Sequence, residues 1–270
     1  MSEATREIEV IRVRDGHRAE SVDRAAAEEP LEVRLHGRPF AVIMRTPGAD
    51  RELAAGFLFA ERVVTTAEDL GTIEHCRDGQ VEDRSNVVNV TLVDSTRIES
   101  AFAEKRQVTT SSSCGLCGRR TIESLAADVP PVTAGWRMPG RTLPRLADRL
   151  RTVQSVFDET GGLHAAGLFT ADGRLMDVAE DVGRHNAVDK IVGRMLMHDA
   201  LPLSDFVLFV SGRSSFEIVQ KALLAGIPVV ASVSAPSSLA IELARQMGVT
   251  LAGFVRGDSF NIYTHPSRIS

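Results

Sequence analysis

The sequence predicts an α/β fold, α+β over the whole chain, with two domains, the second built on a mixed sheet that helices cover on both faces. The chain has 270 residues, 43% of them hydrophobic, which is enough for one large domain or two small ones. A proline-rich segment near the middle separates two parts with different patterns. After it, short apolar runs alternate with amphipathic helical patterns, which is typical of sheets that contain parallel strands.

The first part combines strand and helix patterns. In residues 31–44, polar and apolar side chains alternate on both sides of a glycine turn, as in a hairpin. In residues 46–64, Leu53, Phe57 and Leu58 recur at helical spacing. In chain order we expect a mobile or edge segment (1–30), a hairpin turning at His36-Gly37 (31–44), a helix capped by Thr46, with Pro47, or by Asp50 (46–64), a strand (86–93) and a short helix (119–127).

The segment PPVTAGWRMPGRTLP, residues 130–144, is the best candidate for a linker, because its prolines and glycines interrupt both helix and strand patterns. We therefore expect an N-terminal domain at residues 1–130 and a C-terminal α/β domain at residues 131–270. The predicted elements of the second domain are a helix (143–157), a hairpin turning at Asp172-Gly173 (164–180), a helix (184–198), a strand (205–210), a helix (215–226), a strand (227–234), a helix (237–248) and a strand (249–255).

Charge and hydropathy argue against two classes of partner. The formal net charge of -5 disfavours non-specific binding of nucleic acid. No run of about 18 apolar residues is present, and the N-terminus lacks the apolar core of a signal peptide, so we expect no membrane association. These features predict a cytoplasmic protein with reduced cysteines.

Two predicted strands are followed by loops that lead into helices, where open α/β sheets usually bind ligands. The first loop, Val210 to Glu217, contains Ser211 and Arg213, and the second, Val233 to Ala240, is rich in serine. Serines at a helix start are as typical of ordinary caps as of a ligand site. Arg213 favours an anionic ligand such as a phosphate in the first loop.

The segment AEDVGRHNAVDK, residues 179–190, concentrates polar side chains at one predicted helix start. Helical geometry places His185 and Asp189, four residues apart, on one face. A single histidine is more often structural, but the clustering favours a functional site. The candidate residues are Asp181, Arg184, His185, Asn186, Asp189 and Lys190, with His164 as a weaker candidate upstream.

Cys114 and Cys117 form a CxxC pair within TTSSSCGLCGRR. A zinc site normally needs three or four protein ligands, and one CxxC supplies two, although His75 and Cys76 would add more. The base-deaminase signature is absent, and the pair does not follow the first strand of a compact βαβ unit as in thioredoxin-type proteins. Neighbouring arginines favour thiolates, which makes the loop suited to nucleophilic sulfur chemistry.

Several segments together resemble the FdhD family, the sulfur carriers required for formate dehydrogenase activity. They are SSSCGLCG, TGGLHAA, EDVGRHNAVDK, SGRSSFEIVQKALLAGIPVV, SAPSSLAIELA and GVTLAGFVRGDSFNIYTHP, and they follow the family's order from about Thr46 to Pro266. The resemblance implies a homodimer whose second domain is a three-layer cytidine-deaminase-like fold without the zinc.

The resemblance also implies a sulfurtransferase activity. Sulfur from a cysteine desulfurase would be carried as a persulfide on Cys114 and delivered to the molybdenum of bis-molybdopterin guanine dinucleotide, for use by formate dehydrogenase. Cys117 is the second cysteine of the pair, and no bound metal is implied. The segment that the resemblance assigns to the cofactor comprises Phe254, Val255, Arg256, Gly257, Asp258 and Ser259.

We expect Ser211, Arg213, Arg184, His185 and Asn186 to contribute to the same cofactor site, and a fragment of the cofactor such as guanosine diphosphate to bind there. Two alternatives stay open at this point. One is a non-catalytic chaperone that binds the molybdenum cofactor, and the other is a zinc hydrolase of deaminase-like fold.

Overall fold

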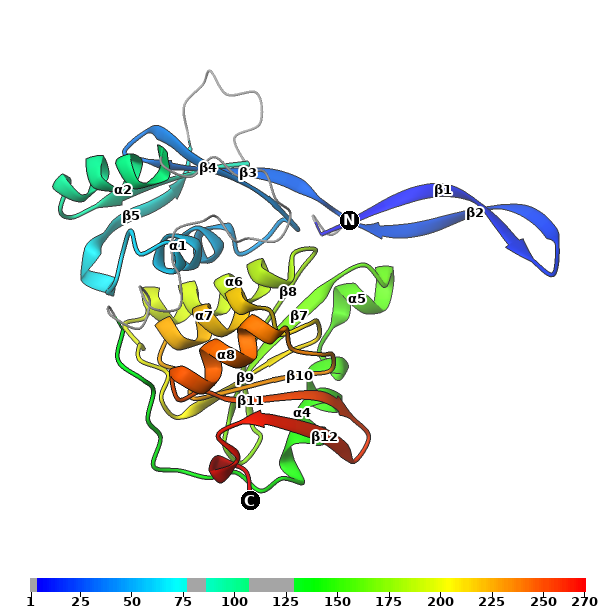
Figure 1. Ribbon diagram of the computed structural model, residues 1–270. Helices are drawn as coiled ribbons and strands as arrows, with labels where there is room; N and C mark the ends of the chain where they lie inside the picture. The colour runs from blue at the N-terminus through cyan, green and yellow to red at the C-terminus, as the bar shows by residue number, and fades with distance from the viewer. Residues whose placement is uncertain (1–3, 77–85, 107–128) are drawn as a thin grey trace.

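The computed structural model describes residues 4–76, 86–106 and 129–270. These residues form a mixed α/β fold, which confirms the predicted class (Figure 1). Their strands make a six-stranded sheet, a four-stranded sheet and a two-stranded ribbon. No helix among the described residues is long and apolar enough to cross a membrane.

The N-terminal ribbon pairs β1 (Thr5–Arg14) with β2 (His17–Ala26) and extends away from the rest of the molecule (Figure 1). Its turn consists of Asp15 and Gly16, both with positive φ, as a tight hairpin requires. The sequence predicted a mobile or edge segment here and missed this regular hairpin. Apart from its base, where β2 contacts α5, the ribbon is uncovered on both faces. Even Ile11 is 55% exposed, and no inward-outward alternation marks the strands.

The four-stranded sheet contains β3 (Glu29–Leu35), β4 (Arg38–Arg45), β5 (Leu70–His75) and β6 (Val87–Leu92), in the order β4-β3-β6-β5. The predicted hairpin at His36-Gly37 and the strand at 86–93 are confirmed. The short 3-10 helix η1 spans Ala67–Asp69. Helix α2 (Thr96–Arg106) lies in a tract where no helix was predicted. Its Phe102 packs against Phe40, with ring centroids 5.4 Å apart.

Helix α1 (Asp50–Ala60) follows the β3–β4 hairpin, but the prediction that Thr46, with Pro47, or Asp50 caps it is wrong. The helix begins after Ala49, which has left-handed backbone geometry, and no side chain caps it. The Thr46 hydroxyl instead accepts a hydrogen bond from the backbone N–H of Val182, 3.1 Å away. Tertiary contact therefore decides the role of Thr46.

The six-stranded sheet has the order β12-β11-β10-β9-β7-β8, with β9, β10 and β11 parallel. The predicted strand–helix alternation and the hairpin at Asp172-Gly173 are confirmed, whereas residues 143–157 form two helices and β12 was not predicted. The elements are α4 (Thr142–Thr152), α5 (Ser155–Thr160), β7 (His164–Thr170), β8 (Leu175–Asp181), α6 (Arg184–Met197), β9 (Phe206–Val210), α7 (Phe216–Leu224), β10 (Val229–Ser232), α8 (Ser238–Gln246), β11 (Thr250–Arg256), β12 (Ser259–Thr264) and the 3-10 helix η3 (Pro266–Arg268).

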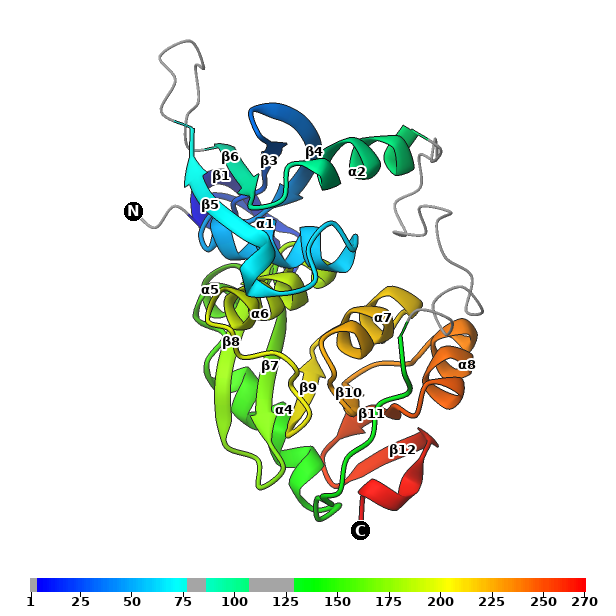
Figure 2. The ribbon, with the colours of Figure 1, turned by 90° about the vertical axis from the view of Figure 1, so that its left-hand side faces the viewer.

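Helices cover both faces of this sheet, as predicted. Side chains of β9 alternate: Leu208 and Val210 join the core under α6, α7 and α8, whereas Val207 and Phe209 join a second core under α4. Figure 2 shows α6, α7 and α8 along one side of the strands. The first core continues through α6 and α1 to the four-stranded sheet. The division at residue 130 stays a prediction.

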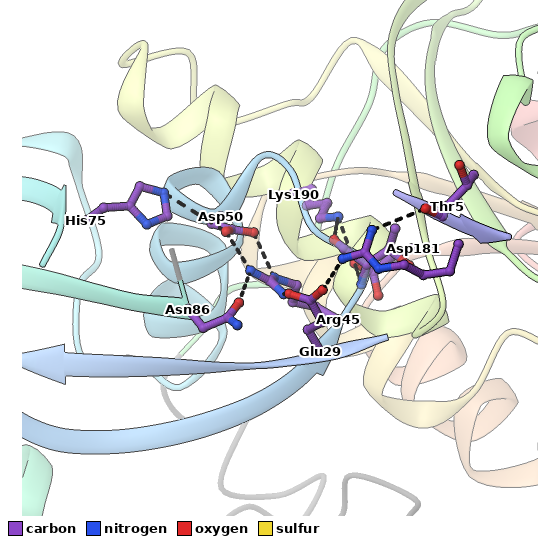
Figure 3. Close-up of polar contacts among 10 residues, drawn as sticks. Thr5, Glu29, Arg45, Asp50, His75, Asn86, Asp181 and Lys190 are labelled. Atoms are coloured by element: carbon purple, nitrogen blue, oxygen red, sulfur yellow. Dashed lines mark hydrogen bonds and ion pairs between the residues drawn. The ribbon is translucent and has the colours of Figure 1, made fainter. Parts of the chain in front are cut away.

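Two buried ion pairs hold the start of α1 between the sheets (Figure 3). Arg45, only 1% exposed, donates to both carboxylate oxygens of Asp50 at 3.0 and 2.9 Å, and to Asn86 at 2.7 Å. Lys190 of α6 lies 2.7 Å from Asp181 at the end of β8, and both side chains are buried. Such pairs fix geometry because removing one partner leaves an uncompensated buried charge.

Candidate functional site

Two pockets lie on opposite sides of the loop that follows β9. We call the cavity of about 440 Å³ between the starts of two helices the α7–α8 pocket. We call the second, of about 570 Å³, the α4–β11 pocket. Both lie at the carboxyl edge of the parallel strands, where the sequence predicted a ligand site.

The α7–α8 pocket forms where two strand–helix loops meet. Ser214 and Pro236 form a bridge between the loops, and the N–H of Ser237 donates to the carbonyl of Ser214 at 3.1 Å. As a result, α7 and α8, whose N-cap residues are Ser215 and Ser237, both begin at this cavity. Helix N-termini favour anionic groups. Two arginines join them in the lining, which consists of Arg184, Arg213, Ser214, Ser215, Phe216, Glu217, Ala235, Pro236, Ser237 and Leu239.

This pocket also contains buried polar atoms without hydrogen-bond partners. In the part of the chain that the structure describes, five buried side-chain atoms have no such partner, and three of them belong to residues lining this cavity. They are Nε of Arg184, Oγ of Ser214 and Oε2 of Glu217, and Ser214 is fully buried. Unpaired buried polar groups are costly, and in the described residues they concentrate beside this cavity rather than in the two hydrophobic cores.

His185 lies behind the pocket rather than in its lining. Its Nε2 is 3.0 Å from Oγ of Ser215 and 3.4 Å from Oε2 of Glu217. Burial, reinforced by the charges of Arg184 and Lys221, lowers the pKa of His185 to about 3. The imidazole is therefore neutral at physiological pH and supports its neighbours through hydrogen bonding.

The buried ion pair of Lys221 and Asp189 lies next to Glu217. Nζ of Lys221 donates to both oxygens of Asp189 at 2.8 and 2.9 Å and lies 3.5 Å from Oε1 of Glu217. Burial alone lowers the pKa of Lys221, but the charges of Asp189 and Glu217 outweigh it and raise that pKa. His185 and Asp189 do share the face of α6 that meets α7, as their spacing predicted.

The α4–β11 pocket contains Ser211 with Val255, Arg256 and Gly257, and His164 lines it as well. The end of β11 and the turn after it bring Val255, Arg256 and Gly257 here. Phe254 within β11 and Gly257 in the turn both have positive φ, and the N–H of Phe254 donates to the Ser234 carbonyl at 3.1 Å. Nε of Arg256 donates to the Val233 carbonyl at 3.4 Å. Two segments that the sequence assigned to one ligand therefore meet in this pocket.

The two pockets share a wall at Gly212. A Cβ built there would lie 3.3 Å from Nδ1 of His164 and 3.4 Å from Cδ of Arg184, which line the two pockets. Burial, followed by the charge of Arg184, lowers the pKa of His164. The charge of Arg184, in one pocket, thus acts on His164 in the other.

Some predicted site residues lie elsewhere. Asn186 donates to the Met44 carbonyl and to Asp181, each at 2.8 Å, and lines neither pocket. Phe254 in β11, Asp258 in the β11–β12 turn and Ser259 at the start of β12 line neither of these two pockets. Cys114 and Cys117 lie outside the described residues. Asp181, Asp189 and Lys190 are engaged in buried ion pairs.

Sequence reasoning missed the pocket role of Glu217. In the sequence, Glu217 and Lys221 look like an ordinary i,i+4 surface pair on a helix, so no local signal distinguishes them. Among the residues that the structure describes, no group of three or more histidine, cysteine, aspartate or glutamate side chains is arranged to hold a metal ion.

The fold and these pockets define a mixed α/β protein with two cavities, each lined by arginine and serine side chains, at the carboxyl edge of its larger sheet. The chain belongs to the FdhD/NarQ family, whose model matches residues 26–270. It is 52% identical to the sulfur carrier protein FdhD of Streptomyces coelicolor, over all of this chain and 97% of that protein. The sulfur carrier protein FdhD of Sulfolobus acidocaldarius is 45% identical, with 98% of each chain covered.

A solved structure supports the same fold. A crystal structure described as a formate dehydrogenase accessory protein from Desulfotalea psychrophila matches with a TM-score of 0.78 and 26% sequence identity. The match covers 99% of this chain and all of the other.

Proposed function

We propose that this protein is a sulfur carrier that serves formate dehydrogenase. It accepts sulfur from a cysteine desulfurase as a persulfide on Cys114 and delivers it to the molybdenum of bis-molybdopterin guanine dinucleotide. It acts in the cytoplasm as a homodimer. The observation that carries this proposal is the similarity, over the full chain, to relatives named sulfur carrier protein FdhD.

The described residues support binding of the cofactor as cargo. Its phosphate groups need N–H donors and positive charge, and the α7–α8 pocket offers two helix N-termini with Arg184 and Arg213. The α4–β11 pocket adds Arg256 and the hydroxyl of Ser211. These residues would bind and orient the cargo, while the thiol chemistry belongs to the CxxC segment.

Mass spectrometry after incubation with a cysteine desulfurase and cysteine tests the sulfur-carrying step. We expect an addition of about 32 Da, one sulfur atom, on Cys114, because its thiolate attacks the outer sulfur of the donor enzyme's persulfide, the S–S bond of the donor breaks and the donor cysteine leaves as a thiolate. Cys114→Ser should abolish loading, whereas Cys117→Ser should retain part of it. Cys76, a half-buried free thiol, provides the matched control, and Cys76→Ser should load normally. Full loading of Cys114→Ser would contradict the assignment.

A second candidate function is cofactor binding without sulfur transfer, which the two pockets would equally support. The same loading experiment separates the two functions. A protein that binds a cofactor fragment but acquires no persulfide would be a cofactor-binding chaperone.

A further inference from the structure

Gln154 places an unpaired amide in the lining of the α4–β11 pocket. The residue is only 4% exposed, and it precedes α5 as its N-cap without capping the helix through its side chain. In the described part of the chain, its side-chain amide has no hydrogen-bond partner, yet the oxygen and nitrogen are not sealed from solvent. An unpaired amide at such a depth is costly, and the cavity that Gln154 lines is the space in which a ligand can reach it.

The depth of the lining residues separates an apolar interior from a charged rim. The buried residues that the structure places in this lining are Leu150, Gln154, Leu163, Phe209 and Val255, and Gln154 alone among them has a polar side chain. The charged residues of the lining are Asp148, Arg151 and Arg256, and all three are exposed. The cavity, about 570 Å³, falls within the range of about 300–1,000 Å³ that is usual for sites of small ligands. Its interior therefore suits an uncharged ring, and its rim suits charged groups attached to that ring.

A primary amide presents a hydrogen-bond donor and an acceptor side by side. A fully ionised phosphate only accepts and an ammonium group only donates, so either would leave half of the Gln154 amide unpaired. A lactam edge, in which a ring N–H stands next to a carbonyl oxygen, pairs with both halves at once. Guanine and pterins carry this edge on a flat ring.

We infer that Gln154 binds the lactam edge of a guanine or pterin ring held in the α4–β11 pocket, with its Nε2 donating to the carbonyl oxygen and its Oε1 accepting from the ring N–H. The inference rests on the proposed binding of molybdopterin guanine dinucleotide. It adds which pocket takes a ring of that ligand and which side chain holds the ring, and it leaves Arg256 at the rim for phosphate.

Two pairs of probes, measured by calorimetry, test the inference and distinguish the ring systems. One pair is guanosine diphosphate and 1-methylguanosine diphosphate, and the other is pterin and 3-methylpterin. In each pair a methyl group replaces the hydrogen of the ring N–H beside the carbonyl. Wild-type protein should prefer the unmethylated member of at least one pair by about ten-fold or more, because the paired hydrogen bonds to the amide are lost. A preference within the first pair indicates guanine, and one within the second indicates pterin.

Gln154→Leu removes the amide and nearly keeps the size of the side chain. We expect this variant to reduce the preference to within about three-fold. It should also melt at the same temperature as wild type or above it, because the amide has no hydrogen bond to the described residues that the substitution could break. Gln246→Leu, at the exposed end of α8, is the matched control and should keep the wild-type preference.

The outcomes separate this inference from the proposed function. If wild type shows no preference within either pair, or if Gln154→Leu retains the preference, Gln154 does not bind the lactam edge. A melting temperature of Gln154→Leu well below that of wild type would assign the amide to the fold and overturn the inference too, as would a failure of all four probes to bind. None of these results touches the sulfur-carrier proposal, which persulfide loading of Cys114 decides independently.

Discussion

Gly193 of α6 packs directly against Gly56 of α1: a Cβ at Gly193 would lie 2.6 Å from the backbone nitrogen of Gly56 and 1.9 Å from the carbonyl oxygen of Glu52. The reciprocal Cβ at Gly56 would lie 2.0 Å from the carbonyl oxygen of Asp189. The helix backbones therefore touch. Because α6 begins with Arg184 and His185, this contact fixes the candidate site relative to the four-stranded sheet.

Gly193→Ala should destabilise the protein by at least about 2 kcal/mol, since the added methyl group meets backbone that cannot move independently. Chemical denaturation measures the effect. Gly135→Ala is the matched control, because a Cβ there meets nothing within 4 Å, and it should change the free energy of unfolding little. Equal stability of the two variants would show that the helices tolerate a wider separation.

Lys190→Met should cost about 3–5 kcal/mol, because it leaves the carboxylate of Asp181 buried without its counter-ion. It also removes the hydrogen bond from Lys190 to the Thr46 carbonyl, 3.0 Å. Arg12→Met breaks an exposed ion pair with Asp23 and should cost no more than about 0.5 kcal/mol. Denaturation curves of both variants make the comparison, and a small loss for Lys190→Met would contradict a structural role for the pair.

The lowered pKa of His185 predicts a pH dependence of stability. Between the ordinary value of 6.5 and the folded value of about 3, the unfolded chain binds a proton that the folded chain excludes. The free energy of unfolding should therefore fall as the pH falls through this window. Relative to His185→Gln, wild type should lose about 1–2 kcal/mol more between pH 7 and pH 5. Parallel curves for the two proteins would rule out a neutral buried imidazole.

Arg213→Ala and Arg256→Ala should each weaken binding of guanosine diphosphate by about ten-fold or more, because each removes a charge-assisted contact to phosphate. Since the two arginines lie in different pockets, calorimetry on both variants also locates the phosphates. A loss in one variant alone assigns them to that pocket. Unchanged affinity in both would remove the phosphate role from these loops.

Much of the fold was predictable because its patterns are local. The strand–helix alternation after residue 200 follows from apolar runs of strand length between amphipathic helices, and the hairpins at His36-Gly37 and Asp172-Gly173 from their turn residues. The ribbon of β1 and β2 was missed because both of its faces are exposed, and the Thr46 cap was wrong because a distant N–H, that of Val182, binds the hydroxyl.

The candidate site was predictable in part. The loop that contains Ser211 and Arg213 was predicted as a ligand site because open α/β sheets bind ligands at the carboxyl ends of their strands, and the strand–helix alternation marks those ends in the sequence. The sequence treated the residues after Val210 and those after Gly253 as one ligand site. In the structure Ser211 does join Val255, Arg256 and Gly257 in the α4–β11 pocket, but Arg213 lines the α7–α8 pocket on the other side of Gly212. That division depends on which side of the β9 loop each side chain faces.

The sequence by itself determined the α/β class, the succession of strands and helices along the second half of the chain and the polar composition of the strand–helix loops, because these depend on periodicity and local turn chemistry. Only the tertiary structure decided which polar groups remain without partners. Lys190 and Asp189 find buried counter-ions, while Arg184 and Glu217, which line the α7–α8 pocket, each retain one buried atom without a hydrogen-bond partner. The reason is physical: hydrogen-bond satisfaction depends on distances between residues far apart in the chain, and no local pattern encodes them.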